Sequence, residues 1–210
     1  MKKVILASAS PRRHELLKLL GIEHEVIPCN EDEKQLRVVE KFKTQLKEKI
    51  TSKTIEQMVL EVAYQKASCV VKSLPANKKM NSLVIGADTI VVLNNEIIGK
   101  PKSKKDAISM LQKLLGNIHE VFTGICILDL KSDKILSAVE KTLVSMIEWP
   151  IERIEAYVDA EHILDKAGGY AIQGIGAAMI DKVDGCFYNV MGLPLSRLVS
   201  MLDNLDYNYL

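Results

Sequence analysis

The sequence predicts an α/β protein with a mixed twisted sheet, and three observations carry this prediction. Short apolar runs that are typical of buried strands alternate with amphipathic helical segments along the chain. Two pairs of strand-like runs are separated by turn signals of two residues, Asn94-Asn95 and Asp184-Gly185. Hairpins join antiparallel strands, whereas strand–helix–strand units join parallel ones. The sheet is therefore expected to contain strands of both directions, with helices flanking it.

The elements of the first half follow from helix-start signals and apolar spacing. Ser10 and Pro11 are typical of a helix start, because proline fits the first helical position, and Gly21 ends the apolar stripe that follows. Apolar residues at core spacing from Met58 to Val70 predict a second, longer helix. The expected helices are 11–20 and 55–71, and the expected strands are 3–7, 23–28, 83–87, 89–93 and 97–98.

The second half repeats the alternation. Ser103 and Asp106 form a capping pair at a helix start, and Gly116 closes this helix. A further helix is expected to begin at Pro150, and the chain ends on a helix over 193–205. The remaining apolar runs predict strands at 121–128, 135–148, 177–183 and 186–190.

Length, charge and hydrophobicity exclude several classes of protein. The 210 residues carry 28 Lys and Arg and 27 Asp and Glu, a net charge of +1, and 48% are hydrophobic. This composition is typical of a folded domain and argues against a disordered chain or a protein with a broad basic surface for nucleic acid. No apolar run has the length of a membrane span, and the one at the N-terminus is too short for a signal peptide. We therefore expect no membrane and no stable nucleic-acid partner.

The cysteines predict a reduced protein. Cys29, Cys69, Cys126 and Cys186 are far apart in the sequence and include no Cys-x-x-Cys pair. They fit neither a zinc site nor a disulfide framework. Free thiols are typical of cytoplasmic proteins, so a cytoplasmic location is expected.

One segment departs from the even charge of the chain. Residues 34–53 contain seven Lys and Arg and two Glu, a net of +5, and the rest of the chain carries −4. Such a charge run is typical of a solvated, partly helical insertion. A basic rim that attracts anionic ligands is the alternative.

Polar residues gather where packing does not require them, first at the start of the first helix. Ser8, Ser10, Arg12 and Arg13 lie between a buried strand and that helix. Hydroxyls, guanidiniums and the N–H groups of a helix N-terminus together predict an anion site. The simpler interpretation, a serine cap and two solvated arginines, leaves cations where the helix dipole disfavours them.

Three further places add the rest of a nucleotide site. Asp88 follows an apolar run at the expected end of a strand, where α/β sheets bind ligands, so it can hold a cation, activate water, or make a turn with Thr89. Lys100, between a glycine and a proline, suits a phosphate contact or a surface turn. Within the glycine-rich segment 165–176, Gln173 can read a base edge. Cations, carboxylates and an amide predict a nucleotide phosphohydrolase.

These same residues resemble the signatures of the Maf family of nucleoside triphosphate pyrophosphatases. The similarity runs in order through 6–17, 86–89, 99–101, 165–174 and 190–194. It implies a fold related to the inosine triphosphate pyrophosphatases: one domain over 1–210, with two lobes around a central cleft and the basic insertion at about 34–53. It also implies a homodimer, a nucleoside triphosphate substrate, and a divalent cation, Mg²⁺ or Mn²⁺.

The resemblance assigns a role to each candidate residue. Asp88 matches the family's proton acceptor, and the segment around it is similar to the branch that hydrolyses dTTP and UTP to the monophosphate and pyrophosphate. Lys66 is assigned because residues 60–67 fit the family's helix. By the same likeness Arg12, Thr89 and Gln173 set specificity, Ser8, Arg13, Lys66 and Lys100 bind phosphates, and Glu33 joins Asp88 as a metal ligand.

Two other functions stay open. One is a nucleotide-binding regulator of cell division and septum formation with little hydrolysis. The other is a nucleic-acid-binding module that uses residues 34–53. Pyrophosphate release from a panel of nucleotides distinguishes the enzyme from both.

Overall fold

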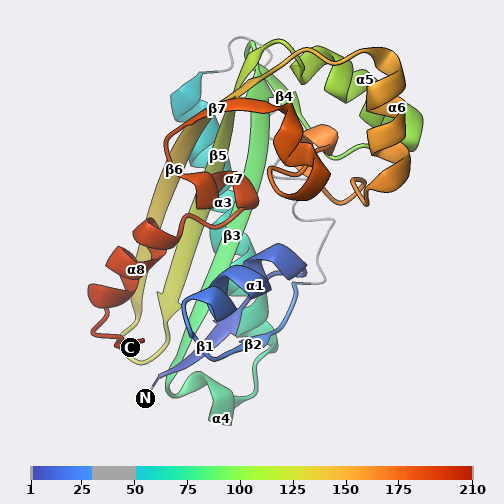
Figure 1. The fold of residues 1–210 in the computed structure, drawn as a ribbon. Helices are drawn as coiled ribbons and strands as arrows, with labels where there is room; N and C mark the ends of the chain where they lie inside the picture. The colour runs from blue at the N-terminus through green and yellow to red at the C-terminus, as the bar shows by residue number, and fades with distance from the viewer. Residues whose placement is uncertain (1, 30–50, 210) are drawn as a thin grey trace. The chain divides into compact units, whose positions relative to one another are not determined.

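A computed structural model of the chain describes residues 2–29 and 51–209 (Figure 1). Its strands are β1 (Lys3–Leu6), β2 (His24–Val26), β3 (Ser82–Leu93), β4 (Glu96–Ile98), β5 (Ile118–Asp129), β6 (Lys134–Met146) and β7 (Ile180–Asp184). They form a seven-stranded sheet in the order β2-β1-β3-β5-β6-β7, and β4 pairs with β3. β1 is parallel to β2 and β3, whereas β3–β4 and β6–β7 are antiparallel. The predicted α/β fold with a mixed sheet is confirmed.

The helices begin and end largely where the sequence signals predict. Pro11 occupies the first turn of α1, and the hydroxyl of Ser103 caps α5 by accepting a hydrogen bond from the Asp106 N–H at 3.1 Å. The helices are α1 (Pro11–Leu19), α3 (Ser52–Ser73), α4 (Ala76–Lys79), α5 (Lys104–Leu114), α6 (Ile151–Ala160), α7 (Phe187–Met191) and α8 (Leu195–Asp203), with the 3₁₀ turns η1 (Ala167–Gly169) and η2 (Gly174–Met179). None of the described helices combines the length and apolar character that crossing a bilayer requires.

The chain divides into two compact units. Unit 1 comprises Met1–Asp88, Thr123–Glu140 and Gly192–Leu210, and unit 2 comprises Thr89–Phe122 and Lys141–Met191. In unit 1, the buried face of α3 packs against β1, β3 and β5. In unit 2, buried residues of α5 and α6 share a core with β5 and β6. Each unit therefore has its own apolar core.

β3 differs from the prediction because it is one continuous strand. The sequence predicted one strand that ends at Ala87 and a second over 89–93, whereas β3 runs unbroken through Asp88. Its partner β1 ends earlier, at Leu6, and the last bond between them joins the Ala7 N–H to the Ile85 carbonyl at 2.8 Å. Asp88 therefore lies beyond the carboxyl end of β1, although it is not at the end of its own strand.

The predicted hairpin around Asp184-Gly185 is wrong. β7 is present, but residues before it form η2, and the expected strand 186–190 is the short helix α7. The side chain of Asn189, on α7, is buried and donates hydrogen bonds to the Val121 carbonyl and the Thr142 hydroxyl, both at 3.0 Å. This amide therefore links α7 to β5 and β6, which are tertiary contacts that the local turn signal does not contain.

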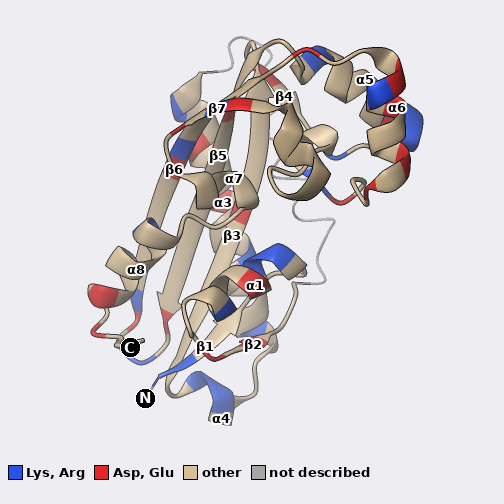
Figure 2. Ribbon diagram, in the orientation of Figure 1, with Lys and Arg blue, Asp and Glu red and all other residues tan. Residues whose placement is uncertain are grey.

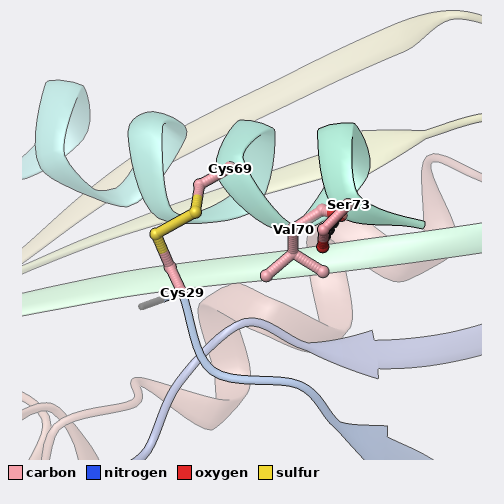
Figure 3. The surroundings of a disulfide bond; sticks show 4 residues. All are labelled: Cys29, Cys69, Val70 and Ser73. Carbon is pink, nitrogen blue, oxygen red and sulfur yellow. Dashed lines mark hydrogen bonds between the residues drawn. A yellow bond between two sulfur atoms is a disulfide. The ribbon is translucent and has the colours of Figure 1, made fainter. Parts of the chain in front are cut away.

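The prediction that all four cysteines are free thiols is also wrong. Cys29, after β2, and Cys69, on α3, form a disulfide, with Cα atoms 5.8 Å apart (Figure 3). Cys126 and Cys186 are free. The spacing of 40 residues gave no motif to recognise. The pair meets because Ile27 and Cys29 pack on the same core as α3, which is a tertiary contact.

The disulfide predicts a defined count of reactive thiols. Alkylation of the unfolded, unreduced protein is expected to modify two of the four cysteines, and alkylation after reduction all four, measured by intact mass. Reduction should also lower the free energy of unfolding by about 2–4 kcal/mol, because the bond closes a long loop in the unfolded chain. A Cys186→Ser variant is the control, and its free energy of unfolding should fall on reduction by the same amount. Four modified cysteines before reduction would contradict the bond.

Candidate active site

The first part of the site lies where β1 leads into α1 in unit 1. Ser8 is buried, with 6% of its surface exposed, and its hydroxyl oxygen accepts a hydrogen bond from the Ser10 N–H at 3.2 Å. Ser10 occupies the N-cap position of α1, but its side chain makes no capping bond. The first turn of α1 is basic and contains no acidic residue (Figure 2). This turn presents positive charge at the positive end of the helix dipole, which favours an anion there.

Arg13 is buried within this part of the site. Its Nε donates a hydrogen bond to the Gly192 carbonyl at 2.8 Å, and its Nη1 donates one to the Ser8 hydroxyl at 3.1 Å. Burial lowers the pKa of Arg13 to about 10, with a smaller lowering by Arg12, while the nearby Asp88 carboxylate opposes the shift. The guanidinium therefore remains a cation at neutral pH. It joins the first turn of α1 to a loop 179 residues away in the sequence.

Asp88 and Lys66 form the second part of the site. The Lys66 ammonium lies 2.7 Å from Oδ1 of Asp88 and donates a longer hydrogen bond to the Ala87 carbonyl at 3.4 Å. Both side chains are mostly buried, at 14% and 19% exposed. Partial burial strengthens the attraction relative to that of a surface pair. The structure thus places the predicted proton acceptor and one predicted phosphate ligand in direct contact.

Gly86 explains why α3 brings Lys66 so close to Asp88. A Cβ atom at Gly86 would lie 2.1 Å from the Ala63 carbonyl oxygen and 3.0 Å from the Ala67 nitrogen. Only glycine allows the backbone of α3 to approach β3 at this point. Lys66 lies on α3 between these two contacts, so the close approach fixes its position beside the strand that carries Asp88.

Three predicted residues belong to unit 2. Thr89 is half-buried in β3, Lys100 is exposed after β4, and Gln173 is exposed at the N-cap of η2. The Gly168 N–H donates a hydrogen bond to the Gly99 carbonyl at 2.9 Å, so the turn that carries Lys100 is joined to the glycine-rich segment. The structure therefore links two motifs that lie about 70 residues apart in the sequence.

Glu33 and most of the basic segment 34–53 lie outside the described residues. In the described part of the chain, no group of three or more His, Cys, Asp or Glu side chains could hold a metal ion. Asp88 supplies one carboxylate. Mg²⁺ commonly uses one or two protein carboxylates and takes its other ligands from water and substrate phosphates. The residues present are therefore compatible with a cation that arrives with a triphosphate.

Sequence reasoning missed the Gly192 carbonyl. Gly192 lies in the motif 190–194, but only a side chain would have suggested a role from sequence. Its φ of +111° is a conformation that favours glycine. The glycine itself, two residues before Pro194, was the available signal of a special backbone position.

Comparisons with known proteins agree with these observations. The family model described as "Maf-like protein" matches residues 3–205. A dTTP/UTP pyrophosphatase of Caldicellulosiruptor bescii is 43% identical over 208 residues, covering 99% of this chain and 97% of the relative. A dTTP/UTP pyrophosphatase of Clostridium botulinum strain Okra is also 43% identical over 208 residues, covering 99% and 100%. One from Acetivibrio thermocellus is 41% identical over 212 residues, covering 100% and 98%. The match spans both units and every motif described above, and the chain belongs to the Maf family.

Proposed function

We propose that this protein is a nucleoside triphosphate pyrophosphatase that hydrolyses dTTP and UTP to the monophosphate and pyrophosphate. The observation that carries the proposal is the Asp88–Lys66 pair, with the cationic Arg13 and the basic first turn of α1 in the same unit. The relatives named dTTP/UTP pyrophosphatase support the choice of substrate. A carboxylate beside several cations suits attack on a phosphoanhydride better than it suits nucleotide binding without hydrolysis.

In the proposed reaction, water attacks the α-phosphorus and pyrophosphate leaves. Asp88 orients this water and accepts its proton through a carboxylate oxygen. Lys66 and Arg12 bind phosphate oxygens and neutralise the charge that develops on them. Lys100 stays a predicted phosphate ligand from the resemblance. Arg13, which the resemblance assigns to phosphate binding, is proposed also to keep Ser8 and the start of α1 in place through its buried hydrogen bonds, so that the N–H groups of this turn can bind an anion.

A divalent cation completes the proposed site. Asp88 would contribute a carboxylate oxygen to Mg²⁺ or Mn²⁺, and the cation, when bound, supplies positive charge to the triphosphate. The homodimer and the cytoplasmic location stay predictions from the resemblance and from the sequence.

The nucleotide panel is the direct test of the proposed function. Pyrophosphate release is measured with UTP, dTTP, CTP, ATP, GTP and 7-methyl-GTP, with added Mg²⁺ or Mn²⁺ and with a chelator. The expected result is preferential hydrolysis of UTP and dTTP that the chelator abolishes. Binding of these nucleotides without release of pyrophosphate would overturn the proposal.

Gln173 is proposed to recognise the pyrimidine edge through its paired donor and acceptor. A Gln173→Ala variant is expected to lower the preference for UTP over GTP, measured as a ratio of kcat/KM values, by about 5- to 10-fold, because hydrogen bonds to the base are lost. A Lys182→Ala variant, at an exposed position on β7, is the control and should keep the wild-type ratio. An unchanged ratio in Gln173→Ala would remove the assignment.

A further inference from the structure

The turn that carries Gln173 is held by the hydroxyl of a tyrosine on α6. The Ala171 N–H donates a hydrogen bond to the Tyr157 hydroxyl at 3.0 Å. Tyr157 is buried, and its ring lies edge-on to Trp149 at 6.4 Å between centroids. The packing of the buried ring therefore fixes the position of the hydroxyl that accepts this hydrogen bond. Gln173 is only two residues beyond the backbone group that this hydroxyl holds.

Gly176, at the other end of the turn, also lies close to the Tyr157 hydroxyl. A Cβ at Gly176 would lie 2.1 Å from the Ala171 carbonyl oxygen and 3.0 Å from the Tyr157 hydroxyl. The backbone at Gly176 therefore approaches the Ala171 peptide too closely for any other residue. Residues 171 and 176 meet at Tyr157, and Gln173 lies on the short loop between them.

A second tyrosine fixes the residue that precedes this turn. The Tyr170 hydroxyl and Nε2 of His119 are 2.7 Å apart, and both side chains are buried. Burial lowers the pKa of His119 to about 4, so the imidazole is neutral at pH 7, with one ring N–H. Two consecutive residues, 170 and 171, are thus held by different partners on β5 and α6.

An open surface pocket of about 440 Å³ lies where η2 faces α6. It is lined by residues of α6, including Ala156 and Tyr157, and by Ile175 and Ala178 of η2. Ile175 is exposed there. On this side, solvent rather than apolar packing lies beside the turn, and the hydrogen bond from Ala171 to Tyr157 is one of the contacts that tie the turn to α6.

From these contacts we propose that Tyr157 and Tyr170 are positioning residues that hold the Gln173 amide where it reads the pyrimidine. The inference rests on the proposed function. Gln173 is itself exposed, so the direction of its side chain depends on the backbone from which it extends. Neither tyrosine contacts the substrate in this proposal, and each acts through the loop over 170–176.

The test uses hydroxyl deletions in the whole protein. Tyr157→Phe and Tyr170→Phe are each expected to lower the ratio of kcat/KM for UTP over GTP by about threefold or more, through a higher KM for UTP, because one hydrogen bond that orders the loop is lost. Tyr207→Phe is the matched control, since Tyr207 is equally buried but belongs to unit 1. The control should leave the ratio unchanged.

The double variant Tyr157→Phe/Gln173→Ala separates positioning from other effects. If Tyr157 acts through Gln173, the double variant should have the same ratio as Gln173→Ala alone. A further decrease in the double variant, or an equal decrease in Tyr207→Phe, would overturn the inference. An unchanged ratio in Tyr157→Phe would also overturn it while leaving the proposed function intact, provided that Gln173→Ala lowers the ratio.

A failure of the proposed function can be told apart from a failure of this inference. Wild-type protein without a preference for UTP would reject the proposed substrate, and with it the role of Gln173. If Tyr157→Phe does not fold, Tyr170→Phe decides the question by the same ratio, because its hydroxyl holds the same loop from the other side.

Discussion

An Asp88→Asn variant is expected to lose about 10²–10⁴-fold in kcat for UTP and dTTP while it keeps its fold. Asparagine has nearly the same shape as aspartate, but its amide does not accept the proton of the attacking water. The change removes the charge partner of Lys66, which lies 2.7 Å away. Since both side chains are mostly buried, at 14% and 19% exposed, the loss of this charge should lower the free energy of unfolding by up to about 3 kcal/mol. Rates are measured as pyrophosphate release at saturating substrate.

The control for Asp88 is an exposed aspartate of the other unit. Asp181, on β7, changed to asparagine removes the same charge from the protein at a position that is exposed. It should leave kcat within about twofold of the wild-type value, since the surface charge acts only through screened, long-range attraction. Near-normal turnover in Asp88→Asn would remove Asp88 from the reaction, and equal losses in both variants would mean that net charge, not the site, decides the rate.

A Gly86→Ala variant is expected to lose both stability and activity. The added methyl group would lie 2.1 Å from the Ala63 carbonyl oxygen, which is backbone, so α3 must move away from β3. Overpacking of this kind lowers the free energy of unfolding by about 1–3 kcal/mol or more. Because Lys66 lies next to this contact, the shift should also separate its ammonium from Asp88. A decrease of about 10²-fold in kcat is expected, consistent with the sensitivity of catalysis to displacements of about 1 Å.

Gly124, on β5, offers a matched control because it packs against the same helix. A Cβ there would lie 2.5 Å from the Val59 carbonyl carbon and oxygen, about two turns of α3 before Lys66. Gly124→Ala should therefore lower stability to a similar extent, measured by denaturant unfolding, with a smaller loss of kcat at a temperature where both variants are folded. Equal losses of kcat would show that the activity of Gly86→Ala reflects general loosening of α3. Wild-type stability in Gly86→Ala would contradict the close contact itself.

Local signals predicted most elements because each depends on neighbours in the sequence. The proline at the start of α1, the serine cap of α5 and the apolar spacing of α3 each act within a few residues, and the structure has helices at all three places. Local signals failed over 177–190, where a two-residue turn indicated a hairpin. There the side chain of Asn189 bonds to groups that come from 47 and 68 residues earlier in the chain.

For the candidate site, too, some features could be predicted from the sequence and others depend on tertiary contacts. The sequence by itself determined the residue types: a basic turn after the first strand, Asp88 in its motif, and a glutamine in a glycine-rich segment. The tertiary structure decided that Arg13 is buried against Ser8 and the Gly192 carbonyl, that Lys66 meets Asp88, and that Cys29 is bonded to Cys69. These contacts join residues from 5 to 179 positions apart, and most of them join different elements. A sequence pattern records which groups a chain carries, but the packing of α3 on β3 and of the turns on one another decides which of those groups meet.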